Sequence, residues 1–183
     1  GRGLLIAGPI GALGLVVLSG CVDHLGNSGR GQIVEHRLEN VLAAPLSADE
    51  LVLLHPHRPP FFFLKRLCEW TPGKRALAEV EFAGDEDFLR GHFPGNPIVP
   101  GVILVEACAQ AAGIALAELT DTAPTAGRPP SLAKIRAMRF RAPVRPRELL
   151  LVEALVTTRF ENNGVVEVVM RRAQTIVAEG EPA

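Results

Sequence analysis

Residues 91–119 read GHFPGNPIVPGVILVEACAQAAGIALAEL, and this stretch decides the fold. Its first part, residues 91–101, holds three prolines and three glycines, which predicts a stiff loop. Residues 102–119 hold no proline and a single internal glycine, which predicts one helix of about five turns. That helix is apolar almost all round, a pattern typical of a helix buried in a core.

Strands are expected on both sides of this helix, because the flanking sequence is rich in β-branched and alternating apolar residues. They are predicted over Phe61–Leu67, Ala76–Phe82, Leu132–Phe140, Glu148–Arg159 and Val165–Ala178. The last two are separated by Asn162-Asn163-Gly164, a hairpin signal. Earlier, Ser47 and Glu50 have the spacing of a helix N-cap and its third residue. This order favours an α+β fold in which an antiparallel sheet wraps the helix.

Ionisable groups in residues 91–119 suggest acid–base chemistry. Glu106 lies in the predicted buried helix with Gln110 one turn later, and a carboxylate there loses solvation. It is either functional, or it reaches the rim or pairs with an arginine. His92 is the one ionisable side chain of the loop, and Gly101 opens the first helix amides to a ligand. Together these groups suit proton abstraction beside a carbonyl and protonation of a leaving group.

Residues 91–110 are very similar to the signature of the 3-hydroxyacyl-acyl-carrier-protein dehydratases of the FabZ type. Two flanking segments agree: Leu54–Phe61 resembles the Pro-His-Arg-x-Pro-Phe segment of that family, and Arg139–Val144 resembles its Phe-x-x-Pro-Val segment. One departure lies at Pro146-Arg147-Glu148, where the family usually has Pro-Gly-Asp, so the turn there is in doubt.

The resemblance implies a hot-dog fold, in which a long central helix is wrapped by a curved antiparallel β-sheet. It implies a homodimer, in some members assembled into a trimer of dimers, with His92 of one chain and Glu106 of the other forming the catalytic pair. It further implies dehydration of 3-hydroxyacyl thioesters to trans-2-enoyl thioesters on the phosphopantetheine of an acyl carrier protein. No metal and no organic cofactor is expected. Glu rather than Asp at position 106 favours a simple dehydratase over a dehydratase-isomerase.

Further roles follow from this resemblance. The amides of Gly101 and Val102 would bind the thioester oxygen, and Gln110 would orient a polar group, unless it is a satisfied core amide. An acyl tunnel is expected, although each candidate side chain is also a plausible core residue; the candidates are Phe61, Phe62, Phe63, Phe88, Phe93 and Ile98. A basic cluster would dock the acidic carrier protein, or else be a solvated strand face; its members are Lys134, Arg136, Arg139, Arg141, Arg145 and Arg147.

Composition and charge exclude several classes of function and indicate how the chain is organised. The chain of 183 residues is 48% hydrophobic and 21% charged with a net charge of −1, so no overall field favours nucleic acid or an anionic membrane. Three cysteines at no metal-binding spacing favour a reducing compartment. Residues 49–180 are expected to form one hot-dog domain, after a connector over residues 32–48.

The first residues need a separate interpretation. Residues 1–21 resemble a bacterial lipoprotein signal ending at Cys21, and residues 22–31 have the composition of a flexible linker. Because acyl carrier proteins work in the cytoplasm, we expect a cytoplasmic enzyme. Residues 1–31 are then an extension, a start-site artefact or part of a longer chain. The competing functions are a hot-dog acyl thioesterase and a non-catalytic hot-dog subunit that pairs with an active partner, and the primary or secondary (polyketide or aryl-polyene) pathway stays open.

Overall fold

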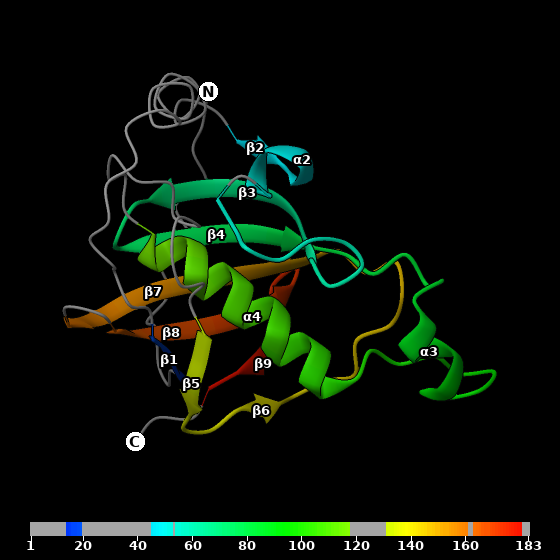
Figure 1. Ribbon diagram of the computed structural model, residues 1–183. Helices are drawn as coiled ribbons and strands as arrows, with labels where there is room; N and C mark the ends of the chain where they lie inside the picture. The colour runs from blue at the N-terminus through cyan, green and yellow to red at the C-terminus, as the bar shows by residue number, and fades with distance from the viewer. Residues whose placement is uncertain (1–13, 20–44, 53, 118–130, 161–162, 181–183) are drawn as a thin grey trace.

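The computed structural model describes residues 14–19, 45–52, 54–117, 131–160 and 163–180. Its longest helix, α4 (Gly101–Leu116), crosses one face of an antiparallel sheet (Figure 1). The strands around it are β1 (Gly14–Ser19), β2 (Leu46–Ser47), β3 (Leu64–Thr71), β4 (Arg75–Val80), β5 (Ser131–Ile135), β6 (Arg139–Phe140), β7 (Leu150–Phe160), β8 (Asn163–Arg172) and β9 (Thr175–Glu179). The helix-and-sheet arrangement confirms the predicted α+β hot-dog architecture.

The strands follow the order β2-β3-β4-β7-β8-β1-β5, and β9 pairs with both β8 and β6. One edge of β8 is shared, because its first half pairs with β1 and its second half with β9. The strand β1 lies within residues 1–31, for which the sequence predicts a leader and linker. The predicted hairpin is confirmed: β7 and β8 are antiparallel neighbours up to the pair Phe160 and Asn163.

Small side chains let the helix approach the sheet closely. In β4 the alternate residues Ala76, Ala78 and Val80 are buried, and α4 contributes Ala107, Ala111 and Ala115 to the same core. Alternation in β4 is the period-2 pattern that its sequence predicts. Where small residues meet, helix and sheet backbones come near each other, which fixes the position of every polar group carried on α4.

Several predicted boundaries are wrong, and two have a clear cause. The strand expected over Phe61–Leu67 begins only at Leu64, because the backbone of residues 61 and 63 bonds the Gln110 side chain instead of a neighbouring strand. The strand expected over Val165–Ala178 is broken into β8 and β9 by a turn at Ala173, which has a φ of 51°. Alanine gives no sequence signal for such a turn.

Two further differences, and one confirmed prediction, concern short elements. The strand expected over Leu132–Phe140 is two strands, β5 and β6. A short helix, α3 (Asp87–Gly91), precedes the loop and was not expected. The helix expected from Ser47 is confirmed as α2 (Ala48–Leu51), whose Glu50 carboxylate accepts hydrogen bonds from the Ser47 N–H and hydroxyl. These bonds hold the pKa of Glu50 below its ordinary value.

Candidate active site

Gln110 is the polar centre of the helix face that meets residues 54–63. It is only 1% exposed, and each end of its amide is bonded. Its Oε1 accepts the N–H of Phe63 at 2.9 Å, while its Nε2 donates to the carbonyl of Phe61 at 3.1 Å and to Oε1 of Glu106 at 3.0 Å. Gln110 is thus a satisfied core amide that also bonds the predicted acid, and its role in orienting a group for the reaction stays a prediction.

Glu106 lies in the second turn of α4, with a side chain that is 21% exposed. Besides Gln110, its Oε1 faces Nε2 of His57 across 3.6 Å. Among the residues that the structure describes, both contacts fall on this one oxygen, and no arginine is paired with it. The second oxygen, Oε2, is therefore the one available to a substrate.

His92 follows α3 and is held within its own loop. Its Nδ1 lies 2.8 Å from the carbonyl oxygen of Ile98, and the N–H of Ile98 returns a bond of 2.9 Å to the carbonyl of His92. A carbonyl oxygen only accepts, so Nδ1 carries a proton and the neutral ring has its lone pair on Nε2. The ring also stacks on Phe93 with centroids 4.3 Å apart. His92 therefore presents Nε2 as a base.

The loop that carries His92 is anchored at two points beyond itself. The N–H of Val99 donates to the carbonyl of Val144 at 2.8 Å, and the guanidinium of Arg145 donates to Oδ1 of Asn96 at 2.6 Å. Both anchors come from the segment after β6. In the turn that follows, Arg147 stands where the resemblance predicts a glycine, and it adopts a φ of 64°, which is more typical of glycine.

Two amides at the start of α4 have no partner among the residues that the structure describes. The N–H groups of Ile103 and Leu104 both donate to the carbonyl of Pro100, at 2.9 and 3.2 Å, whereas those of Gly101 and Val102 are left for a ligand. Phe140 lies directly over Gly101: a Cβ built on this glycine would meet the ring at 2.9 Å. Val102 is 75% exposed, so this end of the helix is open to a binding partner or substrate.

Within one chain, the two predicted catalytic groups belong to separate clusters. In the described residues, the contacts of Glu106 are with Gln110 and His57, and those of His92 stay within its loop. The catalytic pairing of His92 with Glu106 therefore stays a prediction.

The candidate tunnel residues differ in how far their side chains are exposed. Phe63 is buried with Phe82 and the half-buried Phe88 in an aromatic cluster, with ring centroids 5.7 to 6.4 Å apart. Phe62 packs against His55, and Ile98 is half-buried. Phe61 and Phe93 are 48% and 52% exposed. Of the six, Phe61 and Phe93 are the ones that most openly present apolar surface beside the polar groups.

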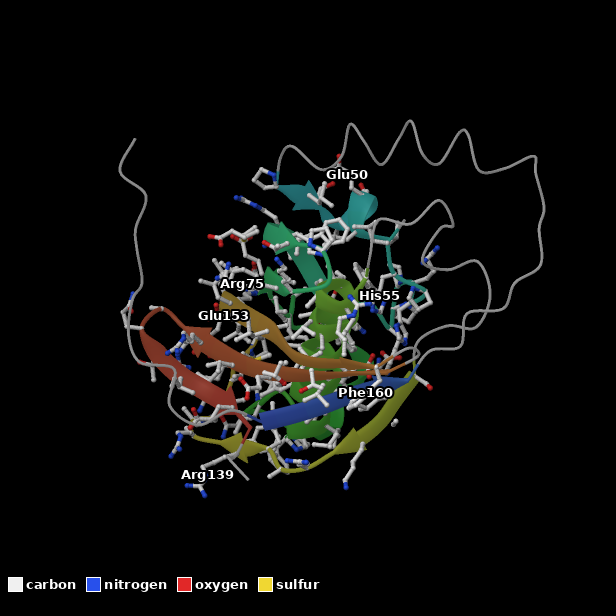
Figure 2. All side chains as sticks on the ribbon, turned by 90° about the vertical axis from the view of Figure 1, so that its left-hand side faces the viewer. Glu50, His55, Arg75, Arg139, Glu153 and Phe160 are labelled. Carbon is white, nitrogen blue, oxygen red and sulfur yellow. The ribbon has the colours of Figure 1, made fainter. Side chains whose placement is uncertain are left out.

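The predicted docking cluster is exposed, but several of its members also have structural partners. Arg141 pairs with the buried Glu179, and Arg145 binds the loop through Asn96. Lys134 and Arg136 lie on or just after β5, and Arg139 projects away from the sheet in Figure 2. The cluster therefore combines exposed charge with residues that hold the fold and the loop.

Sequence reasoning missed two histidines. His55 and His57 lie in the segment before β3, which Gln110 ties to α4, and Figure 2 labels His55 in this segment. Burial lowers the pKa of His55 to about 3, and the neighbouring positive charges of His57 and Arg58 act in the same direction. The signal was present, because both histidines belong to the segment that carries the resemblance, but nothing in the sequence places them beside Glu106.

Known proteins resemble this chain over the segment that contains the candidate site. The family model described as "FabA-like domain" matches residues 55–181. The FabZ 3-hydroxyacyl-[acyl-carrier-protein] dehydratase of Ruminiclostridium cellulolyticum is 44% identical over 60% of this chain and 75% of its own. That of Oenococcus oeni is 37% identical over 65% of this chain and 84% of its own. This chain belongs to the FabZ-type dehydratase family.

Solved structures agree with the FabZ-type fold. The dehydratase heterocomplex ApeI:P from Xenorhabdus doucetiae matches with a TM-score of 0.55 and 17% identity, over 73% of this chain and 91% of that chain. The uncharacterized protein PH1136 from Pyrococcus horikoshii matches with a TM-score of 0.52 and 20% identity, over 69% of this chain and 85% of that chain. At these identities the likeness concerns the fold alone. None of the helices in the described residues is long and apolar enough to cross a membrane.

Proposed function

We propose that this FabZ-type chain dehydrates 3-hydroxyacyl thioesters, carried on the phosphopantetheine of an acyl carrier protein, to trans-2-enoyl thioesters. The observation that carries the proposal is the state of the two groups: the neutral ring of His92 has its lone pair on Nε2, and Oε2 of Glu106 has no contact with another described residue. The curated relatives that match this chain are named for that reaction. The expectation that it proceeds without metal or organic cofactor stays a prediction.

The reaction needs one proton removed and one supplied. His92 takes the proton from the carbon next to the thioester carbonyl, while the amides of Gly101 and Val102 receive the negative charge that develops on the carbonyl oxygen. The bond between the third carbon and its hydroxyl then breaks, and Glu106 protonates the leaving oxygen to give water. The electrons of the broken C–H bond become the new double bond.

The two groups meet in a dimer, with His92 from one subunit and Glu106 from the other. What supports this arrangement is that each group is already fixed by contacts within its own chain, yet the two do not bond each other there. Apolar side chains around the start of α4 are also exposed, as expected for a surface that a second subunit covers; they include Phe93, Val102 and Phe140.

Carrier-protein docking is the second part of the proposal. An acidic carrier would approach the exposed basic cluster, where Lys134 and Arg136 offer charge beside β5. Arg145 links this cluster to the loop of His92. A carrier bound there would therefore lie close to the segment that holds the base.

The direct test is hydration of crotonyl thioester, which is measured as loss of the enoyl absorbance. His92→Ala and Glu106→Gln should each lower kcat/KM by at least about 10²-fold, the usual worth of a positioned acid or base. Glu153→Gln is the matched control, because it neutralises a carboxylate of similar exposure in β7 that pairs with Arg75 (Figure 2). It should leave kcat/KM within a few-fold of the wild type.

The same assay separates the competing functions. Release of free thiol would indicate a thioesterase, and a folded wild-type chain inactive on crotonyl and on carrier-bound substrate would indicate a non-catalytic subunit. Equal rates for the wild type and both site variants would remove His92 and Glu106 from the mechanism.

A further inference from the structure

His57 is a titratable group beside the proposed acid that the reaction outlined above does not use. Its Nε2 lies 3.6 Å from Oε1 of Glu106, and the two side chains are 36% and 21% exposed. Such a distance is too long for a hydrogen bond but admits an ion pair when His57 is protonated, and the proton positions on His57 decide which charges face each other. The proton positions on His57 follow from its contacts with His55, whose ring stacks on it.

His55 determines the tautomer of His57. The backbone N–H of His57 donates to Nδ1 of His55 at 3.3 Å, so Nδ1 of His55 is an acceptor without a proton. Nδ1 of His57 lies 3.1 Å from that same atom, and the two rings stack with centroids 4.8 Å apart. Only a protonated Nδ1 of His57 can bond it, so the neutral form of His57 carries its proton on Nδ1 and a lone pair on Nε2.

His55 stays neutral in this arrangement. It is 3% exposed, and burial brings its pKa to about 3. Arg58 closes the segment from the other side, since its guanidinium donates to the carbonyls of His55 at 2.6 Å and His57 at 2.7 Å. The histidine backbone is thereby held, and the acceptor that faces His57 does not change with pH across the physiological range.

A lone pair on Nε2 cannot face a carboxylate oxygen without repulsion. With a proton on Nε2, His57 forms an ion pair with ionised Glu106; without that proton, the repulsion is relieved when Glu106 itself is protonated. In both states the pair of side chains holds a single proton. We propose that His57 and Glu106 hold one proton as a pair, and that His57 is the positioning residue that keeps it available to protonate the departing hydroxyl.

The charged neighbours support this assignment. Among the described residues, the titratable or charged groups with contacts to His57 are His55, Arg58 and Glu106; Phe61 packs on its ring at 5.7 Å. Glu106 is the one carboxylate among these groups, so a protonated Nε2 of His57 is attracted to it. In turnover the proton passes from the pair to the leaving oxygen through Glu106 while His92 gains one, and exchange with water then restores both groups. This step rests on the proposed dehydration.

The first experiment is the pH dependence of kcat/KM for His57→Gln. A glutamine amide still reaches Glu106 but does not take up a proton, so the acid would then stay protonated only at lower pH. We expect the alkaline limb of the profile to move at least about one pH unit toward acid, and the rate at pH 8 to fall at least about tenfold. Arg58→Lys is the comparison variant: it keeps the charge but weakens the two carbonyl contacts, so it should lower the rate without moving the limb.

A His57→Gln profile that superimposes on the wild-type profile would overturn the proposal. So would an equal shift of the limb in Arg58→Lys, because the effect would then come from loosening the segment.

The second experiment does not depend on activity. Long-range ¹H–¹⁵N NMR of the histidine rings, in the wild type and in Glu106→Gln, reports which nitrogen carries each proton. We expect His55 protonated on Nε2 and His57 on Nδ1, and we expect the pH at which the His57 signals change to drop in Glu106→Gln. An unchanged His57 titration would refute the pair even if the chain proved to be a dehydratase. The expected shift in a chain without dehydratase activity would establish the pair and remove only the proposed reaction.

Discussion

At the residue scale, the candidate site depends on one amide. Gln110 joins the backbone before β3 to the carboxylate of Glu106, and it is buried where no water can replace its bonds. A buried amide with every bond made specifies a single arrangement, because leaving any partner unpaired is costly. The position of Glu106 is thus set by its neighbour one turn along the helix.

Replacement of Gln110 by Met tests this dependence. The change leaves the buried N–H of Phe63 without its acceptor, so the free energy of unfolding should fall by about 1–3 kcal/mol. It also frees the Glu106 side chain, and kcat should fall with it. Urea denaturation and thioester hydration measure the two effects. Ile114→Val, a buried truncation one turn further along α4, should cost about 0.5–1.5 kcal/mol and leave kcat unchanged. Loss of kcat in both variants would show that general loosening of α4 is responsible.

At the element scale, the far end of α4 is seated on the hairpin of β7 and β8. Gly164, near the start of β8, lies beneath Leu116, the last residue of the helix. A Cβ built on Gly164 would approach the side chain of Leu116 more closely than side chains tolerate. Gly164, which the sequence assigned to the hairpin turn, lies instead in β8, paired with Arg159, and there it permits the packing of helix on strand.

Gly164→Ala should accordingly be destabilising, by about 1–3 kcal/mol, because overfilling a packed contact forces Leu116 to move. Gly91→Ala is the matched control, since a Cβ on Gly91 meets nothing within 4 Å. Thermal or urea unfolding of the two variants measures the contrast. Adding Leu116→Ala to Gly164→Ala should recover part of the loss in a double-mutant cycle. Equal stability of the two glycine variants would contradict this account of the contact.

At the scale of the whole molecule, we propose that the site is divided between two subunits. One chain fixes Glu106 through Gln110 and fixes His92 through Ile98, but gives the two no contact among its described residues. A twofold dimer contains two composite sites, each with one group from either chain. This makes the arrangement testable without a structure of the dimer.

Mixing His92→Ala with Glu106→Gln chains provides that test. Each mixed dimer has one intact composite site and one that lacks both groups, so random exchange should restore about a quarter of wild-type activity. Coexpression, or unfolding and refolding of the mixture, allows the chains to exchange, and crotonyl-thioester hydration measures the result. If both groups of a site came from the same chain, the mixture would stay at the level of the separate variants.

The sequence by itself determined the elements whose signals are local. The apolar stretch after Pro100 determined the buried helix, the alternation of Ala76–Phe82 determined a half-buried strand, and Asn162-Asn163-Gly164 marked the hairpin. The loop and helix motif was enough to identify the family and to select His92, Glu106 and Gln110. Periodicity and motif spacing are properties of neighbouring residues, and no tertiary contact is needed to interpret them.

Only the tertiary structure decided what depends on distant partners. The backbone of residues 61–63 leaves the expected strand because it bonds Gln110, which lies 47 residues further along the chain from Phe63. His57 faces Glu106 because Gln110 anchors the segment that follows His57 to the helix. Hydrogen bonds and proton positions between segments so far apart in sequence follow from packing, which residue patterns alone do not specify.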